Sequence, residues 1–284
     1  MKPAITLLGS AWTHLSERNG TLLAAGVAFY AFLAIFPAMI AAVLGYGLIA
    51  SPDTVARQSQ QITDALPADA ASIITGQMES LTQSSGGSLG VGLLLSLALA
   101  TYSASGGVGN LLKALTAIFD GGSERNFVSA KLQAVKLTGG GVVFALVAIA
   151  LVAAAPAVFD LLDLPGFLRF GLEVARWVIL LGAIVLAITV LFRSADHTAD
   201  ARRDDGRRLK RGVLVAAGVW LVASVGFSVY VDNFGSYGET YGALAGVVAL
   251  LLWLWVSVVA LLLGASVEAV SEQDPTLSDP QTVA

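Results

Sequence analysis

Six long apolar runs, separated by short polar segments, dominate the pattern of this chain. The runs cover about 24–50, 89–112, 137–159, 174–192, 213–231 and 243–267. Each has the roughly 20 mainly apolar residues that a helix needs to cross a hydrocarbon core about 30 Å thick. The runs are continuous and do not alternate with a period of two, which argues against an outer-membrane barrel. The pattern predicts an all-α integral membrane protein with six transmembrane helices.

The segments outside the runs have their own patterns. Ile5, Leu8, Trp12 and Leu15 share one helical face, as in a helix that lies in the membrane interface or in an ordinary amphipathic packing helix. The link 51–88 contains two amphipathic stretches, which predict a helical extracytoplasmic insertion between spans one and two. We expect residues 1–270 to form a single membrane domain and 271–284 to be an acidic, disordered cytoplasmic tail.

The composition agrees with the membrane class, since 56% of the residues are hydrophobic, 13% are charged and the mean hydropathy is +0.78. Lys and Arg gather in alternate segments. One set holds Lys2, Arg18, Lys113, Arg125, Lys131, Lys136, Arg193, Arg202, Arg203, Arg207, Arg208, Lys210 and Arg211, and the other holds Arg57, Arg169 and Arg176. Because cytoplasmic loops carry the excess of basic residues, we expect a multi-pass membrane protein with both termini in the cytoplasm.

The inventory of reactive side chains argues against an enzyme. The chain has no cysteine and two histidines, so thiolate chemistry and Cys-based metal sites are excluded. Asp196, His197, Asp200 and Asp204 could ligate a metal, but a solvated loop of mixed charge explains them more simply. The glycines at 45 and 47 close an apolar run and do not follow a strand, so they are no dinucleotide fingerprint. We expect no catalytic residues, no metal, no cofactor and no nucleic-acid partner.

Polar residues are concentrated in the short link after the fifth run. It contains Tyr230, Asp232, Asn233, Tyr237 and Tyr241, together with three glycines, and it has no basic residue. Tyrosines at a span end are explained by the aromatic belt of the membrane interface. Acids this close to a bilayer need water, a partner or a pathway. The link is therefore a candidate functional or architectural unit, which we expect to fold back against the helix ends.

The first two runs supply the other candidate residues. Pro37 should kink the first span, and the hydroxyl of Tyr30 must bond to a neighbouring helix or to water in a cavity. The second span contains Tyr102, Ser103, Ser105 and Asn110 in a run of small residues that suits close helix packing. A locally broken helix that lines a cavity is the alternative.

Several of these segments resemble the YihY/virulence factor BrkB family. Its closing signature is similar to Tyr-Val-Asp-Asn-Phe-Gly-Ser-Tyr-Gly-Glu-Thr-Tyr-Gly-Ala-Leu at 230–244, Leu-Leu-Trp-Leu-Trp at 251–255 and Leu-Gly-Ala-Ser-Val-Glu at 263–268. Its first-span motif is similar to residues 25–37, and its second to Tyr-Ser-Ala-Ser at 102–105. Gly106 and Gly107 stand where the family often has bulkier or basic residues.

The resemblance implies a six-span bacterial inner-membrane protein without an established biochemical activity. Older labels in the family name a ribonuclease, and others refer to serum resistance or to lipopolysaccharide and lipid traffic. No metal ligands or general base for a ribonuclease are found in this sequence.

Two function classes stay open. A protein that transports or positions a lipid or another amphiphile fits the proline in span one, the small residues of span two and the polar outer link. A non-catalytic scaffold, or an envelope-assembly or virulence-associated factor, fits the absence of any intramembrane ion pair in the sequence pattern. The expected partners are membrane lipids, with a second copy of the chain or envelope proteins as further candidates.

The topology can be tested with introduced cysteines, because the chain has none of its own. Cysteines at Gln60 and Gly238 should react with an impermeant thiol reagent in intact cells, whereas a cysteine at Gly206 should react only after the membrane is permeabilised. Labelling of all three positions in intact cells would contradict the six-span topology.

Overall fold

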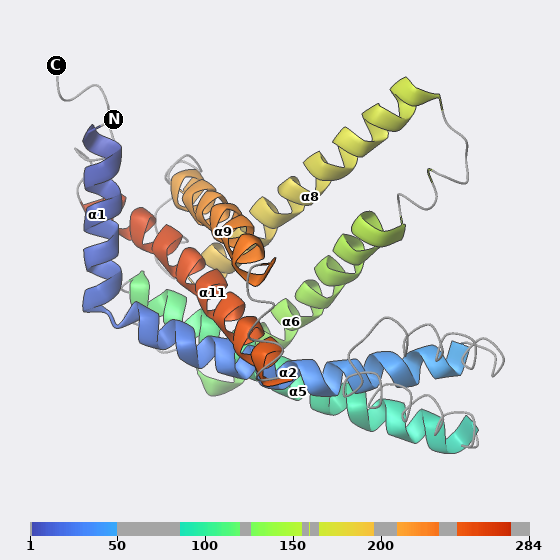
Figure 1. The fold of residues 1–284 in the computed structure, drawn as a ribbon. Helices are drawn as coiled ribbons and strands as arrows, with labels where there is room; N and C mark the ends of the chain where they lie inside the picture. Colours follow the sequence, from blue (N-terminus) through green and yellow to red (C-terminus); the bar gives the residue numbers. More distant parts are fainter. Residues whose placement is uncertain are drawn as a thin grey trace.

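The computed structural model describes residues 2–49, 86–119, 126–154, 159, 165–195, 209–232 and 243–273. Within these ranges the regular structure is helical and no strand occurs (Figure 1). The helices are α1 (Lys2–Glu17), α2 (Gly20–Ile49), α5 (Gly86–Ile118), α6 (Phe127–Ile149), α8 (Gly166–Ala195), α9 (Leu209–Asp232) and α11 (Ala243–Gln273), and a π-helical turn, η1 (Ala150–Ala154), follows α6. The prediction of an all-α fold is confirmed.

Each of the six expected runs coincides with one long helix. Among the described residues, four helices are long and apolar enough to span a membrane, namely Phe127–Val152, Gly166–Ala195, Arg211–Val231 and Leu244–Glu272. If the bent pair Thr6–Glu17 and Gly20–Phe36 is counted as one span, the number of candidate spans rises to five. The six-span count and the topology remain predictions. The boundary between the membrane domain and the tail at residue 270 is also a prediction, and α11 extends three residues past it to Gln273. The insertion at 51–85 and residues 274–284 lie outside the described residues.

The N-terminal amphipathic stretch forms α1, which packs against α2 and α11. The chain bends by 69° between α1 and α2. Asn19 makes this bend with a φ of 54°, a left-handed conformation that asparagine tolerates better than most residues. Its carbonyl accepts the N–H groups of Leu22 and Leu23, both at 3.0 Å, and so caps the start of α2. The contacts of α1 favour a packing helix over one that rests only on lipid.

The buried residues gather where α2, α6 and α9 begin and where α5, α8 and α11 end. We call this region the packed end. Its fully buried large side chains include Leu15, Leu115, Ile118, Phe192 and Leu262. Toward the opposite end, which we call the open end, α6 and α8 extend away from the α2–α5 pair (Figure 1). Large apolar side chains are exposed there, as they are on helices that face lipid.

Side chains from neighbouring helices satisfy the backbone groups at the packed end. The pairs are Arg18 Nη1 to Ala117 O at 2.6 Å, Thr116 Oγ1 to Ala195 O at 3.3 Å, Gln133 Nε2 to Ser194 O at 2.9 Å, Trp255 Nε1 to Thr21 O at 3.0 Å and Gly212 N to Glu268 Oε2 at 3.0 Å. The first N–H groups and the last C=O groups of a helix lack partners within the helix, and leaving them unbonded is costly where water is scarce. Four of the five contacts reach such groups, and the fifth, to Thr21 O, reaches a carbonyl in the first turn of α2. These contacts therefore join the helices at the same place where the apolar side chains pack.

The closest helix approach is between α9 and α11. A Cβ built on Gly264 would lie 2.5 Å from Ala216 Cβ and 2.5 Å from Gly212 O, and one built on Gly212 would lie 2.6 Å from Gly264 O. Only glycine fits at either position, because backbone atoms on the opposite helix cannot move aside as a flexible side chain can. The fully buried Glu268 carboxylate adds a hydrogen bond to the first turn of α9 at the same crossing.

Gly264→Ala should destabilise the protein by about 1–3 kcal/mol, because the added methyl group overpacks the crossing. Gly246→Ala on the same helix is the matched control, since a Cβ there meets nothing within 4 Å. Thermal unfolding in detergent measures both variants. Equal transition temperatures for the two variants would contradict the tight crossing.

Candidate functional site

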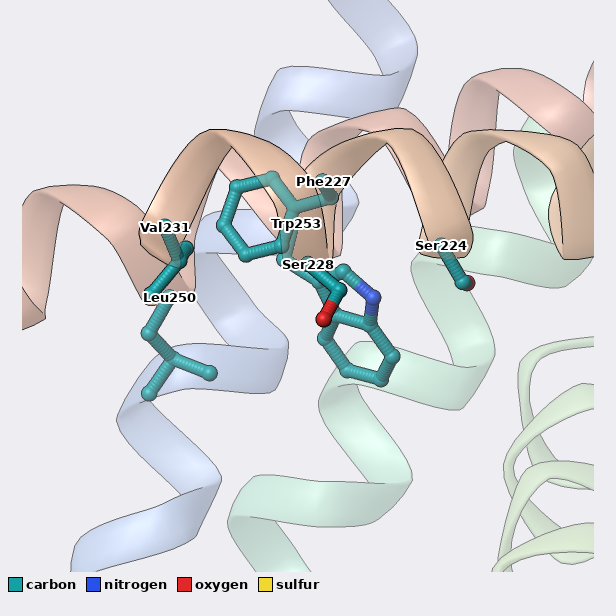
Figure 2. Close-up of a pocket in the computed structure, with 6 residues that line it drawn as sticks. All are labelled: Ser224, Phe227, Ser228, Val231, Leu250 and Trp253. Carbon is teal, nitrogen blue, oxygen red and sulfur yellow. The ribbon is translucent and has the colours of Figure 1, made fainter. Parts of the chain in front are cut away.

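A groove of about 370 Å³ lies between the C-terminal half of α9 and the N-terminal half of α11 (Figure 2). Both helices are long and apolar enough to span a membrane. The groove is lined by Ser224, Phe227, Ser228, Val231, Leu250 and Trp253. The four residues from α9 recur at helical spacing, so they share one face of that helix.

A pair of tryptophans, one of which lines the groove, lies between the two helices. Trp220 Nε1 donates to Ser257 Oγ at 3.0 Å, and the ring centroids of Trp220 and Trp253 are 6.4 Å apart. Trp220 lies one turn beyond Ala216 on α9, so this contact continues the seam that begins at the glycine crossing. The groove opens where the seam ends.

Two serine hydroxyls and the indole N–H of Trp253 are the polar groups of the groove's lining side chains (Figure 2). Ser224 Oγ is buried and has no hydrogen-bond partner among the described residues, and Ser228 is exposed. A hydroxyl can both donate and accept, and a buried one without a partner is costly. Phe227 and Trp253 supply aromatic walls (Figure 2). The groove therefore combines apolar and aromatic walls with hydrogen-bonding groups.

A second polar cluster joins α5 to α6. Lys131 Nζ donates to Ser105 Oγ at 2.8 Å, and the ammonium lies 4.6 Å from the centroid of the Tyr102 ring. Ser105 is 1% exposed and donates its own hydrogen to the Tyr102 carbonyl at 2.9 Å. Two of the candidate residues from the sequence are thus brought together, with a lysine between them that the sequence reading had assigned only to topology.

The small residues of α5 allow a close approach to α2. A Cβ on Gly107 would lie 3.5 Å from Ala31 N and 3.6 Å from Tyr30 C. The helix is continuous from Gly86 to Ile118, which favours packing over a broken helix. The Tyr30 side chain is 45% exposed and makes an edge contact with Phe29, with centroids 5.8 Å apart.

The remaining candidates are not brought into one site. Ser103 and Asn110 are half-buried on α5, and Tyr230 is 42% exposed beside Phe227, with ring centroids 5.9 Å apart. In the outer link, Asn233, Tyr237 and Tyr241 lie outside the described residues. The side chains of Asp232, where α9 ends, and of Pro37, through which α2 continues, are not described either.

Sequence reasoning missed Ser224 and Ser228, which line the groove, and placed Lys131 and Glu268 outside the spans. The structure puts both charged residues inside span-length helices. The predicted spans stop beside Lys136 and Glu268, but a helix continues when a neighbour bonds a charged side chain. The spacing of Ser224, Phe227, Ser228 and Val231 on one helical face was a signal that could have identified the groove.

Within the described ranges, no three His, Asp or Glu side chains are grouped so that they could hold a metal ion. The acids and histidine of the loop around residue 200 lie outside those ranges. The groove and the Lys131 cluster contain hydroxyl, aromatic and ammonium groups.

Comparison with known proteins gives the family. The chain is 26% identical over 281 residues to the putative ribonuclease-like protein YfkH of Bacillus subtilis (strain 168), which covers 97% of this chain and 98% of that protein. It is 45% identical over 58 residues to a UPF0761 membrane protein of Tolumonas auensis, covering 20% of this chain and 19% of the relative. A UPF0761 membrane protein of Alteromonas mediterranea is 38% identical over 84 residues, 30% of this chain and 27% of the relative.

No solved structure matches the chain. The family model described as virulence factor BrkB matches residues 11–283, which is nearly the whole chain. The helices of span length agree with the membrane proteins among the relatives. The chain therefore belongs to the BrkB virulence-factor family of membrane proteins.

Proposed function

We propose that this protein binds a lipid, or another amphiphile, within the cytoplasmic membrane and positions it or moves it between the leaflets. The observation that carries the proposal is the groove between α9 and α11. Its volume of about 370 Å³ lies within the range of small-molecule pockets, about 300–1,000 Å³. It occurs on helices of span length, where the surrounding solvent is lipid.

The lining of the groove selects for an amphiphile. Val231, Leu250 and the two aromatic rings suit an acyl chain, and the hydroxyls of Ser224 and Ser228 suit the ester carbonyls at the end of that chain. By the lysine and arginine pattern, the C-terminal end of α9 is the extracytoplasmic end. The ester groups of outer-leaflet lipids lie near the membrane interface, and in this orientation the two serine hydroxyls lie toward the same interface.

The uneven packing of the bundle supports movement of such a ligand. The packed end holds its helices by buried side chains and by bonds between helices, while α6 and α8 extend away from the α2–α5 pair at the open end (Figure 1). A lipid can enter between helices only where their side chains do not already fill the space. The open end provides that access, and the packed end gives a barrier on the other side.

A non-catalytic scaffold or envelope-assembly factor is the second candidate function. The observation that favours it is the broad exposed apolar surface of α6 and α8, which a second copy or another membrane protein could cover. In both proposals the protein is not an enzyme. The ribonuclease-like name belongs to the Bacillus relative, and neither polar cluster described here offers a metal-ligand set or an acid–base pair for phosphodiester hydrolysis.

Reconstituted vesicles test the lipid proposal. The purified protein should bind a phospholipid probe or accelerate its redistribution between leaflets, and Ser228→Phe should reduce this effect because the added ring fills the groove. Val222→Phe is the matched control, since Val222 lies on the same helix, is 75% exposed and does not line the groove. Both variants should unfold at the wild-type temperature.

Two results would contradict the lipid proposal. One is wild-type protein that neither binds the probe nor redistributes it. The other is a Ser228→Phe variant that behaves like wild type and like Val222→Phe. Either result would leave the scaffold as the better candidate.

A further inference from the structure

The ammonium of Lys131 lies in a span-length apolar helix and forms no ion pair within the described residues. Its described contacts are the Ser105 hydroxyl and the Tyr102 ring. Ionisable residues in membrane helices are costly, and they generally have a partner of opposite charge or a functional role. Among the described residues the partners of Lys131 are neutral, so an anion would complement its charge.

The contacts of Lys131 hold the ammonium in place and leave part of it available. An ammonium has three donors, and Ser105 takes one of them at 2.8 Å. Because the Ser105 hydrogen is directed to the Tyr102 carbonyl, the Ser105 oxygen is free to accept from the lysine. The Tyr102 ring lies 4.6 Å away and contributes a cation–π contact, which further fixes the charge.

The cluster is accessible from the lipid-facing surface. Tyr102 is 69% exposed, and on α6 the neighbouring Val128 and Leu132 are 69% and 55% exposed. Ser105, by contrast, is fully buried, so the ammonium lies between a buried anchor and an exposed ring. Among the described residues, the exposed Tyr102 ring and the exposed side chains of α6 therefore face the side from which a lipid headgroup would approach.

The start of α6 adds positive potential to the same region. Lys131 is the fifth residue of α6, whose N-cap residue, Asn126, makes no side-chain capping bond. The Ser129 hydroxyl donates to the Asn126 carbonyl at 2.8 Å, so it does not cap the free N–H groups. The partial positive charge of a helix N-terminus favours an anion and reinforces the lysine.

We propose that Lys131, anchored by Ser105 and Tyr102, binds the phosphate group of an anionic membrane lipid. A phosphate supplies the missing negative charge and accepts the hydrogen bonds that the ammonium has left. The apolar surroundings favour a phosphate that is carried by a lipid. The inference rests on the proposed function for the nature of its ligand and adds the ligand's charge and a second place of contact, on α5 and α6.

Native mass spectrometry of the full chain, exchanged from nanodiscs, tests the proposal by binding alone. The wild-type protein should retain phosphatidylglycerol in preference to phosphatidylcholine. Lys131→Gln should weaken phosphatidylglycerol binding by about tenfold or more, as expected for loss of a charged hydrogen bond. Lys131→Arg should keep the preference, and Lys136→Gln, at an exposed lysine of the same helix, should leave it unchanged.

Variants of the anchor refine the test. Tyr102→Phe keeps the ring and the carbonyl and should bind phosphatidylglycerol normally, whereas Tyr102→Leu removes the cation–π contact and should weaken binding. Equal affinity of wild type and Lys131→Gln for phosphatidylglycerol would overturn the proposal. So would displacement of the lipid by millimolar inorganic phosphate, which would make free phosphate the ligand.

The link 120–125 lies outside the described residues, and it contains two acids that are alternative partners for Lys131. Variants of these acids are therefore the last control. If the double variant Asp120→Asn, Glu124→Gln gained a phosphatidylglycerol preference far above that of wild type, the anion of Lys131 would be part of the chain, and the proposal would be overturned. Failure of vesicle redistribution with retained, Lys131-dependent binding would reject transport and keep this site. Intact vesicle redistribution without Lys131-dependent binding would reject this site and keep the transport proposal.

Discussion

A helix end placed among apolar side chains must find partners for its backbone groups, and this constraint organises the packed end. At α9 the partner is Glu268 of α11, which accepts the Gly212 N–H where Gly212 and Gly264 bring the two backbones into contact. The negative carboxylate also complements the positive pole of α9. The crossing fixes the register of the antiparallel pair, and that register places Trp220 beside Ser257 and the groove beyond them.

The apolar runs predicted the helices well, because a helix that crosses hydrocarbon must be continuously apolar and must bond its own backbone. They did not predict which helices meet. The contacts of Gly212 with Gly264, and of Gln133 with the end of α8, join residues far apart in sequence, and no local period encodes them. The bend at Asn19 was likewise hidden, since the Asn-Gly pair marks a turn but not its direction.

The positions of the candidate residues depend on how their helices pack. Tyr102 and Ser105 lie together because residues three apart share one face of α5, but the lysine that joins them comes from α6. Tyr30 contributes its backbone to the α2–α5 contact, and its ring faces outward. The Tyr/Gly/acid link had the richest composition, yet the two described polar clusters formed elsewhere, where helices meet and leave a charge or hydroxyl between them.

We propose that the bundle is held together at one end and gives lipid access at the other. Spin labels at introduced cysteines measure this directly by pulsed electron resonance, since the chain has no cysteine of its own. Labels at Lys113 and Arg193, on exposed positions of the packed end, should give a narrow distance distribution in every membrane. Labels at Val147 and Leu168 should give a broad distribution that shifts with lipid composition. Equally narrow distributions for both pairs, unchanged in all lipids, would contradict the account.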